Sequence, residues 1–133
     1  MNGLGRTFLI YGASRGLGKA IVNLVPEAQD KVYGVSRSIP KNNAQLNWIC
    51  ADLSTPEEAV DKVKKAVKDE KIDVLIYNVG IWENNAFTEN YNFEEVSSAE
   101  LNTILNTNIN TSIQSLQSLI ENLKLSDNGQ SKT

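Results

Sequence analysis

The stretch TFLIYGASRGLGKAIVNLV, residues Thr7–Val25, decides the fold of this chain. It opens with a short apolar run that ends at Gly12 and continues through a turn that contains three glycines. Apolar residues then recur at helical spacing until Pro26, which cannot continue a helix. The pattern therefore predicts a strand, a glycine turn and a helix, in that order.

The glycine turn has the features of a loop that binds phosphate. Gly12, Gly16 and Gly18 allow a tight turn, a close approach of the backbone to a pyrophosphate, and close packing of the helix on the strand. The helix N-terminus offers free N–H groups and a partial positive charge to phosphate groups. We therefore expect a nucleotide phosphate at this turn; the alternative is a glycine-rich turn without a ligand.

Further strands and helices alternate along the rest of the chain. Apolar runs and helical spacing predict strands at Lys31–Ser36, Leu46–Cys50 and Ile72–Tyr77, a polar loop around Pro40–Asn43, and helices from Pro56 to about Glu70 and from Ser97 to about Lys124. Capping boxes are predicted where these two helices begin, at Thr55 with Glu58 and at Ser97 with Glu100. The alternation favours an α/β fold, a doubly wound parallel sheet covered on both faces.

The last predicted helix carries two sets of apolar residues. One set is expected to face inward as a single stripe: Leu101, Leu105, Leu116, Leu119 and Leu123. A second set widens the apolar face and predicts contact with another copy of the chain: Ile109, Ile113 and Ile120. Asn108 falls within the inward stripe, so its amide is expected to find polar partners there.

The composition indicates one domain, residues 1–133, without a metal site. With 133 residues and 41% hydrophobic positions, the chain can bury a core. The net charge of -3 without a single-sign block argues against nucleic acid as a partner. The chain has no histidine, and its one cysteine, Cys50, is expected to be buried in a strand. No apolar run approaches the ~18 residues of a membrane span, so we expect a cytoplasmic protein without a membrane partner.

Four ordered motifs resemble those of the short-chain dehydrogenases/reductases. They are the turn GASRGLG, similar to TGxxxGxG in that family; Asp52-Leu53 after the third strand; Asn78-Val79-Gly80 after the fourth; and Asn108 in the long helix. The resemblance covers Thr7 to Lys124. It implies a Rossmann-like fold, of which this chain holds the first half, with strand order 3-2-1-4.

Two tyrosines depart from the family pattern. Tyr11 replaces the small hydroxyl residue that usually precedes the first glycine, and this exchange removes a hydrogen bond of the turn. Tyr77 stands where the family has the first Asn of Asn-Asn-Ala-Gly, and Val79 is only slightly larger than the usual Ala. We expect the fold to tolerate these changes.

The residues around the second strand predict NADP as the cofactor. An acidic side chain at the end of that strand would bind the ribose 2′-hydroxyl of NAD, but the sequence reads Ser36-Arg37. Arg15 in the turn is expected to contact the same 2′-phosphate as Arg37. Charge-assisted hydrogen bonds from two arginines would favour NADP over NAD by roughly two to four orders of magnitude. The alternative is a pair of solvated surface arginines.

The resemblance also assigns roles to single residues. It implies that Asp52 accepts from the adenine amino group, with the backbone of Leu53 against the ring. The segment 78–81 would border the adenine ribose and the middle of the cofactor, with Ile81 near the nicotinamide. Asn108 would hold a water that links the catalytic lysine to solvent. The predicted cofactor-binding set is Gly12, Ser14, Arg15, Gly16, Leu17, Gly18, Ser36, Arg37, Asp52, Leu53, Asn78, Val79, Gly80 and Ile81, and the predicted catalytic residue is Asn108.

These assignments leave alternatives open. Asp52 is also consistent with an acid that caps a helix or closes a loop, and the segment 78–81 with a plain turn after a buried strand. The amide of Asn108 is also consistent with an Asn that bonds only to neighbouring backbone. Asn106 and Asn110 make the register of this helix arguable.

The resemblance implies catalytic residues that do not occur in residues 1–133. The family uses a Ser on a fifth strand and a Tyr four residues before a Lys, but none of the four tyrosines here precedes a Lys by four. We therefore expect a piece of a longer reductase that ends before the fifth strand; the alternative is a naturally short protein. The full protein would reduce a ketone or aldehyde with NADPH, or catalyse the reverse oxidation, as a homodimer or homotetramer. The alternative function is a non-catalytic NADP-binding or interaction module.

Overall fold

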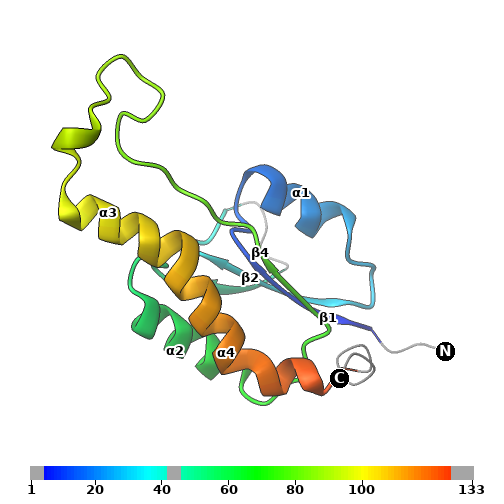
Figure 1. Ribbon diagram of the computed structural model, residues 1–133. Helices are drawn as coiled ribbons and strands as arrows, with labels where there is room; N and C mark the ends of the chain where they lie inside the picture. The colour runs from blue at the N-terminus through cyan, green and yellow to red at the C-terminus, as the bar shows by residue number, and fades with distance from the viewer. Residues whose placement is uncertain (1–4, 42–45, 127–133) are drawn as a thin grey trace.

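The computed structural model describes residues 5–41 and 46–126, and its centre is a parallel sheet (Figure 1). The strands are β1 (Thr7–Tyr11), β2 (Lys31–Ser36), β3 (Asn47–Cys50) and β4 (Val74–Tyr77). They lie in the order β3-β2-β1-β4, and all pairs are parallel. The predicted fold class and strand order are therefore confirmed.

Helices cover both faces of the sheet (Figure 1). They are α1 (Gly16–Leu24), α2 (Pro56–Val67), the short 3-10 turn η1 (Phe93–Glu95), α3 (Ser98–Leu105), the π-helical segment η2 (Asn106–Asn110) and α4 (Thr111–Lys124). Because side chains alternate along a strand, Phe8 and Ile10 of β1 pack toward α1, whereas Leu9 and Tyr11 pack toward α2 and α4. None of the helices among the described residues has the length and apolar content needed to cross a membrane.

Several element boundaries differ from the predicted ones. α2 ends at Val67 rather than near Glu70, because Lys68 adopts a backbone conformation with φ 53° and ψ −123°. β4 begins at Val74 rather than Ile72, whose N–H instead donates to the carbonyl of Asn122. The loop expected around Pro40–Asn43 lies partly outside the described residues.

Of the two predicted capping boxes, the first does not form and the second forms only in part. The hydroxyl of Thr55 donates to the carbonyl of Asp52 at 2.9 Å and does not cap α2, so the first box is wrong. The Ser97 hydroxyl accepts from the N–H of Glu100 at 3.1 Å, as predicted. The carboxylate of Glu100 accepts from the N–H of Asn84 instead of returning to the cap.

The single long helix that the sequence predicts is interrupted by η2. The N–H of Thr111 donates to the carbonyl of Asn106, which is the spacing of a π-helix. The face of α4 and η2 that is buried carries mostly polar residues: Thr107, Thr111, Ser115, Leu119 and Asn122. The predicted leucine stripe is confirmed only at Leu119 and Leu123, which pack in the core, and is wrong at Leu105 and Leu116, which are about half exposed. The expectation that Cys50 is buried is also wrong, because it lies exposed on the edge strand β3.

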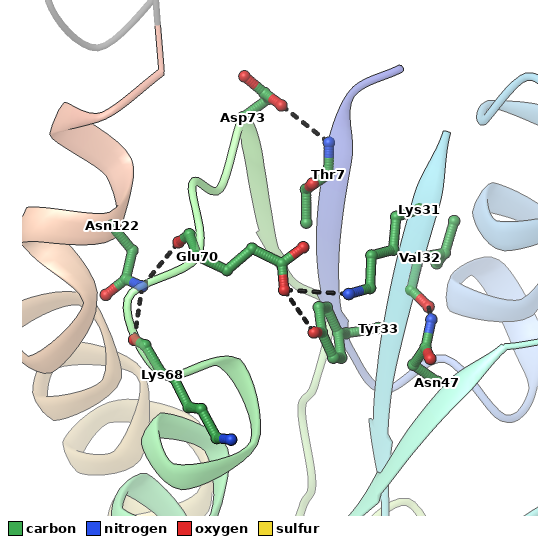
Figure 2. Close-up of polar contacts among 9 residues, drawn as sticks. All are labelled: Thr7, Lys31, Val32, Tyr33, Asn47, Lys68, Glu70, Asp73 and Asn122. Atoms are coloured by element: carbon green, nitrogen blue, oxygen red, sulfur yellow. Dashed lines mark hydrogen bonds and ion pairs between the residues drawn. The ribbon is translucent and has the colours of Figure 1, made fainter. Parts of the chain in front are cut away.

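Polar contacts hold α4 to the end of the sheet where the parallel strands begin (Figure 2). The amide nitrogen of Asn122 donates to the carbonyls of Lys68 and Glu70 at 2.9 and 2.8 Å, and its oxygen accepts from Lys64 Nζ at 2.7 Å. One oxygen of the Glu70 carboxylate accepts from the hydroxyl of Tyr33 at 2.6 Å. A single buried amide thus joins α4, α2 and the connection to β4.

Truncating Asn122 should destabilise the protein. We expect Asn122→Ala to lower the free energy of unfolding by about 2–3 kcal/mol, because two carbonyls and one ammonium lose their partner. Urea denaturation measures the change. Asn102→Ala is the matched control: it gives the same gain in helix propensity at an exposed position and should change stability by about 0.5 kcal/mol or less. Equal effects of the two substitutions would contradict the role given to Asn122.

Candidate functional site

A cleft of about 640 Å³ opens where the strands β1, β2, β3 and β4 end. Its lining residues are Gly12, Ser14, Arg15, Val35, Ser36, Arg37, Ser38, Pro40, Ala51, Asp52, Leu53, Ser54, Asn78, Val79, Gly80, Ile81, Thr103 and Thr107. The connection after β1 runs through α1 on one face of the sheet and the connection after β3 runs through α2 on the other, so the strand order reverses between β1 and β4. In open parallel sheets, ligands bind in the crevice at the carboxyl ends of the strands where the order reverses.

The glycine turn brings three backbone segments together beside this cleft. A Cβ atom at Gly12 would lie 2.3 Å from the carbonyl oxygen of Asn78, and one at Gly18 would lie 1.8 Å from the carbonyl oxygen of Gly12. Gly12 also has φ +79°, a conformation that other residues rarely adopt. Side chains at these two positions are therefore excluded by contact with backbone, which leaves the turn open toward the cleft.

The N-terminus of α1 faces the turn with its N–H groups uncapped. Arg15 is the cap residue, its backbone is extended, and its side chain forms no cap hydrogen bond. The first turn also contains no acidic residue. A helix start with free N–H groups and no neutralising acid favours an anionic ligand.

Two arginines border the cleft without partners. Among the residues that the structure describes, neither the Arg15 nor the Arg37 guanidinium forms a hydrogen bond or an ion pair. Ser36 lies next to Arg37 at the end of β2, and its hydroxyl donates to the carbonyl of Ser38 at 2.5 Å. This strand end therefore presents positive charge and no carboxylate to the cleft.

Asp52 closes the loop that follows β3. Its carboxylate accepts from the hydroxyl of Ser54 at 2.7 Å and from the N–H of Ser54 at 3.0 Å. The hydroxyl and N–H of Ser54 hold the pKa of Asp52 below its usual range, and the positive charge of Arg37 adds to the effect. Asp52 is thus an ionised acceptor at neutral pH that also serves as a loop acid, one of the alternatives open from the sequence.

The helix segment η2 supports two walls of the cleft. The hydroxyl of Thr111, the residue after η2, donates to the carbonyl of Leu53 at 2.6 Å. The N–H of Ile81 donates to the amide oxygen of Asn108 at 2.8 Å, and the amide nitrogen of Asn108 donates to the carbonyl of Ile81 at 2.9 Å. Asn108 therefore binds both backbone groups of one residue, as the backbone-bonding alternative allowed, and it does so at the edge of the cleft.

The structure brings most of the predicted residues to one place. Eleven of them, including Arg15, line the cleft. Gly16 and Leu17 line an adjoining cavity of about 480 Å³, and Arg15 and the segment 78–80 line both cavities. Gly18 lies behind the turn and Asn108 lies behind Ile81. Sequence reasoning missed these lining residues: Val35, Ser38, Pro40, Ala51, Ser54, Tyr77, Thr103 and Thr107. The spacing of four between Thr103 and Thr107 was a usable signal, because it places both on one helix face.

Comparison with known proteins gives the same family as the motifs. The model of the short chain dehydrogenase family matches residues 6–131. The chain belongs to the short-chain dehydrogenase family. It is 34% identical over 94 residues to the 3-oxoacyl-(acyl-carrier-protein) reductase FabG of Vibrio cholerae, which covers 64% of this chain and 38% of the relative. It is 30% identical over 116 residues to the hydroxysteroid dehydrogenase-like protein 1 of Gallus gallus, covering 79% of this chain and 34% of the relative.

Two of the solved structures that resemble this chain are named as members of the same family. A short-chain dehydrogenase/reductase from Brucella ovis, solved in complex with a partially ordered NAD, has a TM-score of 0.74 and 25% identity, covering 92% of this chain and 59% of that one. A second oxidoreductase from Brucella ovis has a TM-score of 0.73 and 26% identity, covering 90% and 56%. The chain spans about a third to a half of the length of the curated relatives that it matches.

Proposed function

We propose that the full protein is an NADP(H)-dependent oxidoreductase that reduces a ketone or aldehyde, or catalyses the reverse oxidation. This chain supplies the cofactor cleft. The observation that carries the choice of NADP is the pair of guanidinium groups of Arg15 and Arg37 beside a strand end without a carboxylate. Neither group forms a hydrogen bond or an ion pair within the described part of the chain. Positive partners of this kind suit a 2′-phosphate, whereas the 2′-hydroxyl of NAD is bound by an acidic acceptor.

The residues of the cleft fit the parts of a dinucleotide in order. The uncapped start of α1 would hold the pyrophosphate, because its N–H groups have no other acceptor in the first turn. Asp52 would accept from the adenine amino group, with the Leu53 backbone against the ring. The segment 78–81 would carry the central part of the cofactor toward Ile81. When bound, the nicotinamide would supply the hydride in the reduction or accept it in the oxidation, and the chain's own residues would bind and orient the cofactor.

The names of the relatives favour an oxidoreductase, but one of them also supports a second candidate function. The relative from Vibrio cholerae is named a reductase of 3-oxoacyl groups, and the relative from Homo sapiens, 27% identical over 116 residues, is named an inactive hydroxysteroid dehydrogenase-like protein 1. The second candidate is therefore a protein that binds NADP in this cleft without turnover. Both candidates share the cofactor and differ in whether the full protein consumes NADPH.

Reversing the charge at Arg37 should shift cofactor preference toward NAD. We expect Arg37→Asp to weaken NADP binding by roughly 10- to 100-fold or more, because it removes a charge-assisted hydrogen bond and adds a repulsive carboxylate. Calorimetric titration with NADP and NAD measures both affinities. Lys65→Asp is the matched control, since it makes the same charge change at an exposed position of α2 that does not line the cleft. A wild-type protein that binds NAD as tightly as NADP would contradict the proposed preference for NADP.

The full-length protein should oxidise NADPH in the presence of a carbonyl substrate. Absorbance of NADPH, followed with a panel of diketones, quinones and aldehydes, measures turnover. Residues 1–133 alone should show none, because general acid–base groups typically contribute ~10²–10⁴-fold and the family's Tyr and Lys are not in this segment. If the full protein binds NADPH and turns over no carbonyl of the panel, the non-catalytic candidate is the better one. Turnover by residues 1–133 would require a different proton donor.

The same proposal includes a homodimer or homotetramer, formed through the outer face of α3 and α4. Five apolar side chains with exposures of 42% to 61% lie there: Leu105, Ile109, Ile113, Leu116 and Ile120. Burying such a face against a second copy is favourable, and exposed apolar patches of this kind mark interaction surfaces. Light scattering should show a dimer or tetramer of the full protein at micromolar concentration, and Ile113→Glu should dissociate it. A monomeric wild type would contradict this assembly.

A further inference from the structure

Tyr77 forms a contact with η2 that lies outside the proposed contacts to the cofactor. It is the last residue of β4, and its hydroxyl donates to the carbonyl of Thr107 at 2.5 Å. Its ring lies against that of Tyr11, its partner in the sheet, with the ring centroids 4.9 Å apart. Tyr77 thus reaches from the end of a strand into the π-helical segment η2.

The next residue of η2 contacts the same strand extension four residues further on. Asn108 follows Thr107 directly and binds both backbone groups of Ile81. The segment 77–81 is therefore fastened to η2 at its first and last residue. Between these points lies Gly80, where an added Cβ would meet nothing within 4 Å. The wall of the cleft formed by Asn78–Ile81 is thus a short bridge between two anchors.

No other described side chain joins η2 to β4 or its extension by a hydrogen bond. Two polar contacts from this part of the helix run instead to the loop after β3: Asn106 donates to the carbonyl of Ser54 at 3.3 Å, and Thr111 donates to that of Leu53. These contacts fix η2 against the adenine side of the cleft. The position of η2 relative to β4 depends on the Tyr77 hydroxyl and the Asn108 amide.

We propose that Tyr77 is a positioning residue that holds η2 through Thr107, so that Asn108 keeps Ile81 in place at the cofactor cleft. The consequence for nucleotide binding rests on the proposed function; the contact itself does not. A phenylalanine would fill the same space and keep the ring contact with Tyr11, so packing alone does not call for a hydroxyl. Burial, and to a smaller extent Tyr11, raises the pKa of Tyr77, so this hydroxyl stays a donor at physiological pH.

Amide hydrogen exchange tests the positioning role without a ligand. In the full-length protein, Tyr77→Phe should make the N–H of Ile81 exchange about two- to tenfold faster and shift the side-chain amide signals of Asn108 in NMR spectra. Tyr33→Phe is the matched control, because it removes a hydroxyl bonded at 2.6 Å to Glu70 at the opposite end of the sheet. The control should leave Ile81 and Asn108 unchanged. Unchanged exchange of Ile81 in Tyr77→Phe would overturn the proposal.

A double-mutant cycle tests whether Tyr77 acts through Asn108. Tyr77→Phe should weaken NADPH binding a few-fold in the wild-type background and add little in the background of Asn108→Ala. Full additivity of the two losses would overturn the proposal, whatever happens to the folding stability. A wild-type protein that does not bind NADPH would instead refute the proposed function, and the exchange of Ile81 would still decide the role of Tyr77.

Discussion

The rest of the structure depends on the contact between three backbone segments at the end of β1. Gly12, Gly18 and Asn78 approach so closely that a methyl group at either glycine would overlap a carbonyl. This approach places the start of α1 directly beside the end of β4. Because the strand and the helix start are fixed here, the uncapped N–H groups, the two arginines and the segment 78–81 all open onto one cleft.

How much of the fold could be predicted depended on the kind of pattern in each segment. β1 and β2 have the predicted bounds at Thr7–Tyr11 and Lys31–Ser36, since short apolar runs next to glycine or polar loops have few other structures. The last helix was harder to predict, because several of its apolar residues do not face the core. Thr111 and Asn122 are buried because carbonyls from distant segments accept from them, and periodicity contains no information about such partners.

The candidate site shows the same limit. Residues in motifs, such as Gly12 and Asp52, could be placed in the cleft from their position after a strand. Tyr77 and Thr107 could not be paired, because they are 30 residues apart and the contact joins a side chain to a backbone carbonyl, which periodicity does not encode. Cys50 was placed wrongly for a related reason: its neighbours in sequence are apolar, but β3 is an edge strand with an exposed side.

The polar inner face of α4 has a consequence for its outer face. At one end Thr111 binds the loop after β3, and at the other Asn122 binds the start of the β4 connection, so hydrogen bonds set the register of the helix. In the middle, the hydroxyls of Tyr11 and Ser115 are buried, and burial raises the pKa of Tyr11 to about 12 against a smaller opposing effect of Ser115. A helix turned this way directs Leu119 and Leu123 to the core but cannot also direct Ile113, Leu116 and Ile120 there. These three side chains are left exposed, where only another apolar surface removes them from water.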